Sequence, residues 1–213
     1  MKFSDTGTLT ADDMQARLGK LTASNMWKAM DYLKSGKESQ ARRDYAIQLV
    51  AERMTGVFVP HYVNDAMQWG IEKEPLAREW YSHKVGKTVF AGQFLDHPEI
   101  DLCGATPDGF VDDGLVEFKC PNSSTYIKWK LARTIPDEHW PQLALQLSVT
   151  GRPWVDFCAF DPRMPEAQRG FIRRFEREKA QAYIESVEEH ARSFLREVDE
   201  LFEQVTQSGT DIA

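Results

Sequence analysis

The sequence predicts an α/β or α+β domain in which helices flank a small mixed sheet. Three observations support this fold class. Apolar residues follow helical spacing in the first third of the chain, form short runs of strand length in the middle, and return to helical spacing at the end. We therefore expect one domain over residues 1–213, with N-terminal helices over 10–55, a core over about 64–164 and a long C-terminal helix over about 170–206.

Length, composition and charge limit the class of protein. The 213 residues are 42% hydrophobic and 11% aromatic, which supports a sizeable core and excludes a disordered chain. With 26 Lys+Arg against 33 Asp+Glu the net charge is −7, which excludes a uniformly basic coat for nucleic acid but allows a local basic groove. The sequence has no membrane-spanning run and no signal peptide, so we expect a cytoplasmic protein with no membrane partner.

The N-terminal part begins with two short predicted helices. Thr10 can cap a helix that ends near Gly19, because a threonine oxygen accepts a bond from a free N–H of the first turn. Thr22 or Ser24 can cap a second helix that continues to Met30.

Two longer helices are predicted to follow. Polar N-cap residues and spaced apolar side chains predict one helix over 39–54 and another over about 64–84. Pro75 lies inside the second helix and should distort it locally, because proline has no N–H for the helical bond. A change of period then predicts a strand over 87–95.

The next segment is the clearest β signal in the chain. Residues 109–120 contain two short apolar runs around Asp113-Gly114, a dipeptide that favours the positive φ angles of a tight hairpin turn. After this hairpin the pattern predicts helices over 124–133 and 141–149, a buried strand over 154–160, and a long helix from Gly170.

The hairpin carries the side chains that predict chemistry. Alternate residues of a strand share a face, so Glu117 and Lys119 point together while Val116 and Phe118 point into the core. Asp108 begins the partner strand, so its carboxylate can approach that of Glu117. Paired carboxylates repel unless they hold a cation, and Mg²⁺ prefers such hard oxygen ligands. Lys119 could then orient or help to deprotonate an attacking water.

This spacing alone also fits the solvated face of an ordinary hairpin, and the surrounding residues decide between the two interpretations. Residues 104–111 (GATPDGFV) and 116–121 (VEFKCP) resemble the core of the PD-(D/E)xK nucleases, and more closely the lambda-exonuclease and YqaJ-type viral recombinase family. Four further blocks resemble the family in the family's order: 17–24 (RLGKLTAS), 66–77 (AMQWG with Glu74 and Ala77), 142–151 (QLALQ and VTG) and 161–164 (DPRM).

The resemblance implies a restriction-endonuclease-like core and a set of roles. Asp108 and Glu117 match the two core metal ligands, and the carbonyl of Phe118 matches a third. Glu74 matches a carboxylate on a helix that completes the metal site, although its charged neighbourhood would otherwise indicate a surface residue. The implied catalytic set is Asp108, Glu117, Lys119, Glu74 and Gln142, and Gln142 and Gln146 could alternatively be ordinary polar residues of a helix face.

Three residues match family positions that bind a terminal 5′-phosphate. These are Arg17, Ser24 and Thr106. Guanidinium and hydroxyl donors suit a phosphate because they supply charge and several hydrogen bonds.

The chain departs from the family pattern at two places. Thr125 stands where a further phosphate-binding arginine is expected, and Lys128 or Lys130 could compensate. Asp13 stands where an aromatic residue is expected. Met67 is then the apolar candidate for a wedge that separates the strands, with core packing as its alternative role.

The resemblance implies a Mg²⁺-dependent 5′→3′ exonuclease of double-stranded DNA, in which Mn²⁺ can substitute. It implies release of 5′-mononucleotides, single-stranded 3′ tails for recombination by strand annealing, a homotrimer, a single-strand annealing partner, and a phage or prophage origin in a bacterial host. The alternatives are another PD-(D/E)xK nuclease, either an endonuclease or a RecB-like end-resecting enzyme, and a DNA-end binding module without catalysis. An apolar seam near the C-terminus predicts packing on the chain's own domain or on a neighbouring subunit: Ile184, Val187, Ala191, Phe194, Val198, Leu201 and Val205.

Overall fold

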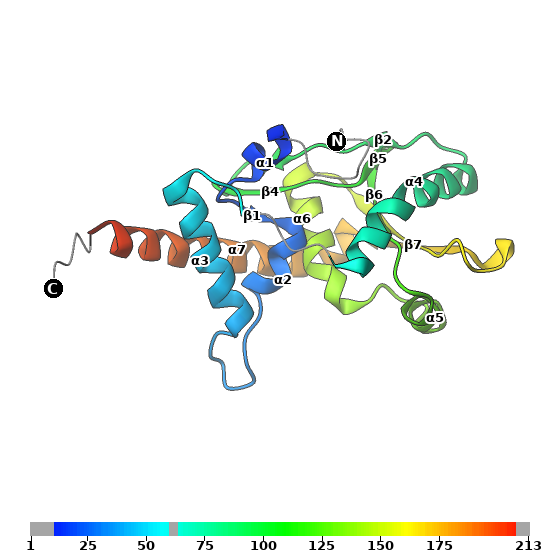
Figure 1. Cartoon of the computed structure of the whole chain (residues 1–213). Helices are drawn as coiled ribbons and strands as arrows, with labels where there is room; N and C mark the ends of the chain where they lie inside the picture. The colour runs from blue at the N-terminus through cyan, green and yellow to red at the C-terminus, as the bar shows by residue number, and fades with distance from the viewer. Residues whose placement is uncertain (1–10, 60–63, 208–213) are drawn as a thin grey trace.

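A five-stranded mixed sheet forms the centre of the molecule (Figure 1). The computed structural model describes residues 11–59 and 64–207. The strand order is β2-β5-β6-β7-β8, and all neighbours are antiparallel except the parallel pair β6–β7. The strands are β2 (Phe90–Ala91), β5 (Gly109–Val111), β6 (Gly114–Lys119), β7 (Trp154–Phe160) and β8 (Gly170–Glu176).

A smaller sheet lies beside the first. Its order is β1-β4-β3, with β1 parallel and β3 antiparallel to the middle strand. Its strands are β1 (Leu21–Thr22), β3 (Leu95–Asp96) and β4 (Cys103–Ala105). The helices are α1 (Ala11–Arg17), α2 (Met26–Ala29), α3 (Gln40–Thr55), α4 (Asp65–Val85), α5 (Ser123–Ala132), α6 (Trp140–Thr150) and α7 (Arg177–Gln207).

Both faces of the central strand β6 are buried, and each packs against different helices. Val116 and Phe118 belong to a core cluster with Ala77 and Tyr81 of α4. Leu115, which alternates with them, belongs to the larger cluster that α6 and α7 share. The period of two in β6 therefore divides the molecule into an α4 side and an α6 side, and the predicted class of a small mixed sheet between helices is confirmed.

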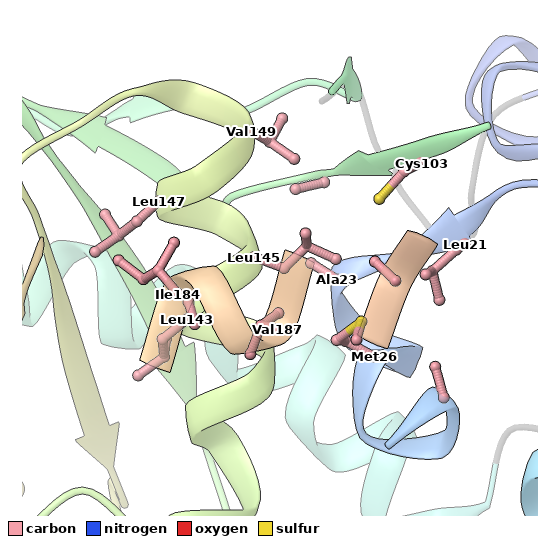
Figure 2. Packing of buried hydrophobic residues seen from close by; sticks show 14 of the residues in the cluster. Leu21, Ala23, Met26, Cys103, Leu143, Leu145, Leu147, Val149, Ile184 and Val187 are labelled. Atoms are coloured by element: carbon pink, nitrogen blue, oxygen red, sulfur yellow. The ribbon is translucent and has the colours of Figure 1, made fainter. Parts of the chain in front are cut away.

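Helix α6 is the centre of the larger core (Figure 2). Its residues from Pro141 to Val149 are buried except for Gln142, so apolar side chains face every direction. In Figure 2, Leu143 and Leu147 approach Ile184 of α7, and Leu145 faces the segment that carries Ala23. The seam of α7 packs on its own domain, because its residues from Ile184 to Val198 are buried within the chain.

Several predicted elements are confirmed close to their expected limits. Helices α3, α4, α5 and α6 and strand β7 occupy the predicted segments. The Oγ of Ser39 accepts from the N–H of Arg42 (3.0 Å), and the Oδ1 of Asn64 accepts from the N–H of Met67 (2.9 Å), so both helices begin at a side-chain cap. Helix α4 continues through Pro75 as one helix from Asp65 to Val85. No helix among the described residues is long and apolar enough to cross a membrane.

The predicted second helix is largely wrong. The chain forms strand β1, then a 3₁₀ turn over Ala23–Asn25, and α2 has only four residues. Thr22 lies in β1 and precedes the turn without a side-chain capping bond, and its Oγ1 accepts from the side-chain Nδ2 of Asn25 (3.0 Å). Strand pairing between distant segments overrides the local capping signal here. The Thr10 cap predicted for the first helix lies outside the described residues.

The predicted strand over 87–95 is also wrong. The segment contains two separate strands of two residues, because β2 pairs with β5 in the large sheet and β3 pairs with β4 in the small one. Gly92 lies at the crossing between the two sheets. A Cβ built there would be 1.8 Å from the carbonyl oxygen of Pro107, so the backbones approach too closely for any side chain.

The turn of the hairpin differs from the prediction. Val111 pairs with Gly114, so the two loop residues are Asp112 and Asp113, and the positive φ (48°) belongs to Asp112. Gly114 is the first residue of β6. A Cβ at Gly114 would be 2.3 Å from the ring of Trp154, so this glycine is needed for packing rather than for the turn.

The long C-terminal helix begins later than predicted. Residues Gly170 to Glu176 form β8, which pairs along its whole length with β7, and α7 starts at Arg177. Phe171 and Phe175 are buried four positions apart, a spacing that fits one face of a strand or of a helix, so the apolar pattern alone does not separate β8 from the helix that follows. Pairing with β8 covers an edge of β7 that would otherwise be open.

Candidate active site

The candidate site lies where the β5–β6 hairpin opens. The paired ladder ends at Gly109 and Val116, and by the same register the residue opposite Phe118 is Pro107. Proline has no N–H to continue the ladder. The N–H of Phe118 instead donates to the Oδ2 of Asp108 at 2.7 Å. The local sequence thus splits the two strands and fixes the Asp108 carboxylate against β6.

Glu117 is the hydrogen-bonding centre of the site. Its side chain is only 3% exposed, and its Oε1 accepts from the Nζ of Lys119 and the Nε2 of Gln142, both at 2.6 Å. Its Oε2 accepts from the Nε2 of Gln146 at 2.7 Å. Gln142 and Gln146 lie four residues apart on one face of α6, so this helix presents both amides to the same carboxylate. The Nζ of Lys119 also donates to the Oε1 of Gln142 at 3.2 Å.

Helix α4 brings Glu74 to the other side of the site. The Nη2 of Arg78 donates to the Oε1 of Glu74 (2.8 Å) and to the backbone carbonyl of Asp108 (2.9 Å). Its guanidinium also lies 5.2 Å from the ring centroid of Phe118. Sequence reasoning missed Arg78, although its position four residues after Glu74 on a helix was a usable signal for an ion pair.

The electrostatics of the site are dominated by carboxylates. Burial, followed by the charges of Glu117 and Glu74, raises the pKa of Asp108 well above its ordinary value. Burial also raises the pKa of Glu74, in spite of the nearby Arg78. Burial would lower the pKa of Lys119, but Glu117 and Asp108 outweigh it and raise that pKa, so this lysine is held as a cation.

The donor set suits a hard divalent cation that takes few protein ligands. The described residues contain no group of three or more His, Cys, Asp or Glu side chains arranged to hold a metal ion. Mg²⁺ is usually held by one or two carboxylates, with water and phosphate oxygens as its remaining ligands. After burial, the charge of Glu117 raises the cost of ionising both Asp108 and Glu74, and a cation beside these carboxylates would lower that cost.

Two of the predicted phosphate-binding residues are in direct contact. The Nη2 of Arg17 donates to the Oγ1 of Thr106 at 2.7 Å, across 89 positions of sequence. Ser24 and Arg17 line the same cavity of about 50 Å³, with Lys20 beside them. Burial lowers the pKa of Arg17, and its buried Nε has no hydrogen-bond partner among the described residues. A guanidinium with an unused donor beside a small cavity is suited to an anion.

The structure also places the residues at which the chain departs from the family pattern. Asp13 lies close enough to Arg17 for its charge to act on the pKa of that arginine. The Nζ of Lys130 donates to the carbonyl of Gln168 at 2.7 Å, which directs this lysine to the β7–β8 connection. Met67 is 47% exposed in the first turn of α4, so its alternative role as a core residue is wrong.

Comparisons with known proteins give the family and the fold of the chain. Residues 14–153 match the model of the YqaJ-like viral recombinase domain. The structure resembles the alkaline exonuclease LHK-Exo from Laribacter hongkongensis, with 36% identity, a TM-score of 0.85, and coverage of 96% of this chain and 100% of that chain. A structure of LHK-Exo in complex with dAMP has the same identity and coverage and a TM-score of 0.86.

A more distant match shows the fold alone. A phage-related exonuclease from Haemophilus somnus 129PT is 13% identical over 87% of this chain and 96% of that chain, with a TM-score of 0.63. The comparison with curated proteins finds no match.

Proposed function

Since the chain belongs to the YqaJ-like viral recombinase family and has the fold of the alkaline exonucleases, we propose that it is a Mg²⁺-dependent 5′→3′ exonuclease of double-stranded DNA. It releases 5′-mononucleotides and leaves 3′ single strands for recombination by annealing. The observation that carries this proposal is the ion pair of Lys119 and Glu117 (2.6 Å) at the open end of the hairpin, beside two further carboxylates, Asp108 and Glu74, whose pKa values are raised by burial and by the charge of Glu117. The dAMP bound to LHK-Exo supports a deoxynucleotide as product.

The carboxylates would hold the metal. Asp108, Glu117 and Glu74 supply oxygen ligands, and the carbonyl of Phe118 adds another. In an extended strand the N–H and C=O of one residue face the same side. The N–H of Phe118 faces Asp108, so the carbonyl of Phe118 faces that side too. The residue opposite is Pro107, which has no N–H to donate to this carbonyl. When bound, Mg²⁺, or Mn²⁺ in its place, activates water and offsets charge on the phosphodiester.

Lys119 and the glutamines organise the reacting groups. Lys119 keeps its proton, so it donates to the attacked phosphate or to the attacking water and offsets the charge that develops there. Gln142 bonds both Lys119 and Glu117, which fixes the direction of the ammonium. Gln146 donates a hydrogen bond to the second carboxylate oxygen of Glu117.

Arg17, Thr106 and Ser24 would bind the terminal 5′-phosphate. Arg17 and Thr106 are already joined, and Thr106 is two residues from the metal ligand Asp108, so the terminal phosphate and the next phosphodiester can be held together. Met67 is exposed on α4 and supplies the apolar wedge that separates the strands.

The biological setting follows from the family. We propose a homotrimer that encloses the DNA, a single-strand annealing protein as partner, and a phage or prophage gene product acting in the bacterial cytoplasm. Light scattering should give about three times 24.4 kDa. A monomer that degrades long duplexes without dissociating would contradict the ring.

A linear duplex labelled at either end tests the activity. With Mg²⁺, the label at each 5′ end should leave first as a mononucleotide, and EDTA should stop the release. Closed circular duplex should remain intact, whereas an endonuclease would cut it. Release of the 3′ label first, or DNA-end binding without any cleavage, would contradict the proposal.

A further inference from the structure

A second and larger cavity opens beside the candidate active site. It measures about 680 Å³ and includes Lys119 and Gln142 in its walls. It also includes Ser24, which lines the small cavity of Arg17. Ser24 therefore separates the two cavities, and the larger one reaches both the proposed phosphate pocket and the proposed site of cleavage. Helices α2 and α6, which carry much of its wall, pack against each other.

This position is the one that the terminal nucleoside must occupy. In the proposed reaction, water attacks the phosphorus of the second nucleotide, a new P–O bond forms, and the bond from phosphorus to the 3′ oxygen of the terminal nucleotide breaks. The 3′ oxygen takes up a proton, and the terminal nucleotide leaves with its own 5′-phosphate. Its sugar must therefore lie between the 5′-phosphate and the cleaved phosphodiester, and its base extends sideways from that sugar.

The walls of the two cavities differ in chemistry. The small cavity is lined by the cations Arg17 and Lys20 and by one acid, Glu52; Lys20 is paired with Asp96 (2.6 Å), so Arg17 is the cation with an unused donor for a phosphate. The large cavity has Lys119 at its active-site end, and elsewhere it is lined by three aromatic rings and two acids: Trp27, His139, Tyr183, Asp31 and Glu138. Carboxylates repel a phosphate, but they accept hydrogen bonds from the N–H groups of a nucleotide base. Aromatic rings stack on such a base.

Trp27 provides the stacking surface. It is 45% exposed on α2, which leaves a large aromatic surface in the wall of the cavity. His139 lies at the start of α6, its ring fixed by Trp129 and Phe157 at centroid distances of 5.1 Å each. Its Nε2 is buried without a hydrogen-bond partner among the described residues and lies 3.7 Å from the Oε1 of Glu138, so the imidazole contributes its ring to the wall rather than a polar atom to the ligand.

We propose that this cavity binds the base of the 5′-terminal nucleotide, which stacks on Trp27 while the active site cleaves the bond behind it. This inference rests on the proposed exonuclease function. Stacking on an aromatic ring accepts any of the four bases, as a processive enzyme needs. The site would then hold one nucleotide by its two ends, the phosphate at Arg17 and the base at Trp27.

The first test measures release of the first nucleotide from two 5′-phosphorylated duplexes, one complete and one with an abasic 5′-terminal sugar. Wild type should act on the abasic end about 5- to 100-fold more slowly, since stacking of one base is lost. Trp27→Ala should act on both ends at similar rates, equal to the wild-type rate on the abasic end. Trp27→Phe should restore the discrimination. Phe90→Ala, which removes an aromatic residue that is 67% exposed on β2, is the matched control and should behave as wild type.

The second test does not depend on catalysis. Calorimetry compares the binding of thymidine 5′-monophosphate and 2-deoxyribose 5-phosphate in the presence of Mg²⁺. Wild type should bind the nucleotide more tightly, and Trp27→Ala should bind both equally. That result without any digestion of duplex would refute the exonuclease but support the base site. Normal digestion with equal rates on complete and abasic ends, or discrimination unchanged in Trp27→Ala, would overturn the base site and leave the exonuclease standing.

Discussion

Glu117 and Asp156 lie on the neighbouring strands β6 and β7, and both are 2% exposed, yet their surroundings differ. Asp156 faces α4 and is fully paired. It accepts from the Nε and Nη2 of Arg174 at 2.8 and 2.9 Å and from the hydroxyl of Tyr81 at 2.7 Å. Glu117 faces α6 and shares the single ammonium of Lys119 with a second carboxylate, Asp108.

The difference separates a structural charge, Asp156, from Glu117, for which we propose a functional role. One guanidinium balances one carboxylate at Asp156, so the pair is complete within the chain. At the candidate active site, three carboxylates (Asp108, Glu117 and Glu74) are balanced by only two cations, Lys119 and Arg78. Burial raises the pKa of Asp108, and the charges of Glu117 and Glu74 raise it further. A buried excess of one sign indicates that a further group of opposite charge completes the site. Four predictions test or sharpen this contrast.

The largest effect is expected at the active site. Glu117→Ala or Lys119→Ala should lower nucleotide release by about 10²-fold or more, because each removes preorganised charge at the reacting phosphate. Release is measured as acid-soluble nucleotide from linear duplex. Glu72→Ala, which removes a half-exposed acid of α4, is the control, and wild-type turnover in Glu117→Ala would refute the assignment.

The structural acid should affect stability rather than chemistry. Asp156→Ala leaves the hydroxyl of Tyr81 and the guanidinium of Arg174 without their acceptor, and we expect a loss of about 2–3 kcal/mol in the free energy of unfolding. The side chain of Arg174 is 45% exposed, so water takes over part of its hydrogen bonding and limits the loss. Urea unfolding measures the change. Asp156→Asn should lose less, because an acceptor oxygen remains; an unchanged midpoint in Asp156→Ala would contradict the contrast.

The phosphate pocket should show a smaller effect. Wild type should digest duplex with a 5′-phosphate about tenfold faster than duplex with a 5′-hydroxyl, since one charged hydrogen-bonding partner is worth roughly that factor. Arg17→Ala should remove most of this preference and leave slow cleavage. Thr125 in place of an arginine keeps the preference below that of a pocket with two guanidinium groups. Initial rates on the two duplexes measure it, and equal rates in wild type would exclude the pocket.

The smallest effect concerns the dependence of stability on pH. The pKa of Asp108 is higher in the folded protein than in the unfolded chain, so ionisation of this residue costs stability once the pH exceeds its unfolded pKa of about 4. Asp108→Asn removes that cost and keeps an acceptor for the N–H of Phe118. In EDTA, its thermal midpoint should exceed that of wild type at neutral pH.

Lowering the pH tests whether ionisation of Asp108 is the cause of this difference in stability. As the pH falls toward 4, wild-type Asp108 becomes protonated in both states, so the advantage of Asp108→Asn should shrink and vanish. Midpoints measured by calorimetry from pH 4 to 8 follow this difference. An advantage that is constant over this range would mean that the carboxylate is not the cause.

Local sequence determined much of this protein. The limits of α3, α4, α6 and β7 follow from caps and apolar periodicity within each segment. The pairing of Glu117 with Lys119 follows from the period of a single strand, and Pro107 beside Asp108 ends the ladder where the site opens. These features needed no information from distant residues, because neighbouring positions fix them.

Tertiary structure alone decided the rest. Three hydrogen bonds of the site join residues that are far apart in the sequence: Gln146 to Glu117 across 29 positions, Arg17 to Thr106 across 89, and Arg78 of α4 to the carbonyl of Asp108 across 30. The segment 87–95 divided between two sheets, and β8 formed ahead of α7, because strands obtain their hydrogen bonds from partners far along the chain. Caps and periodicity describe one segment at a time, whereas a sheet partner or a buried ion pair depends on which segments the fold brings together.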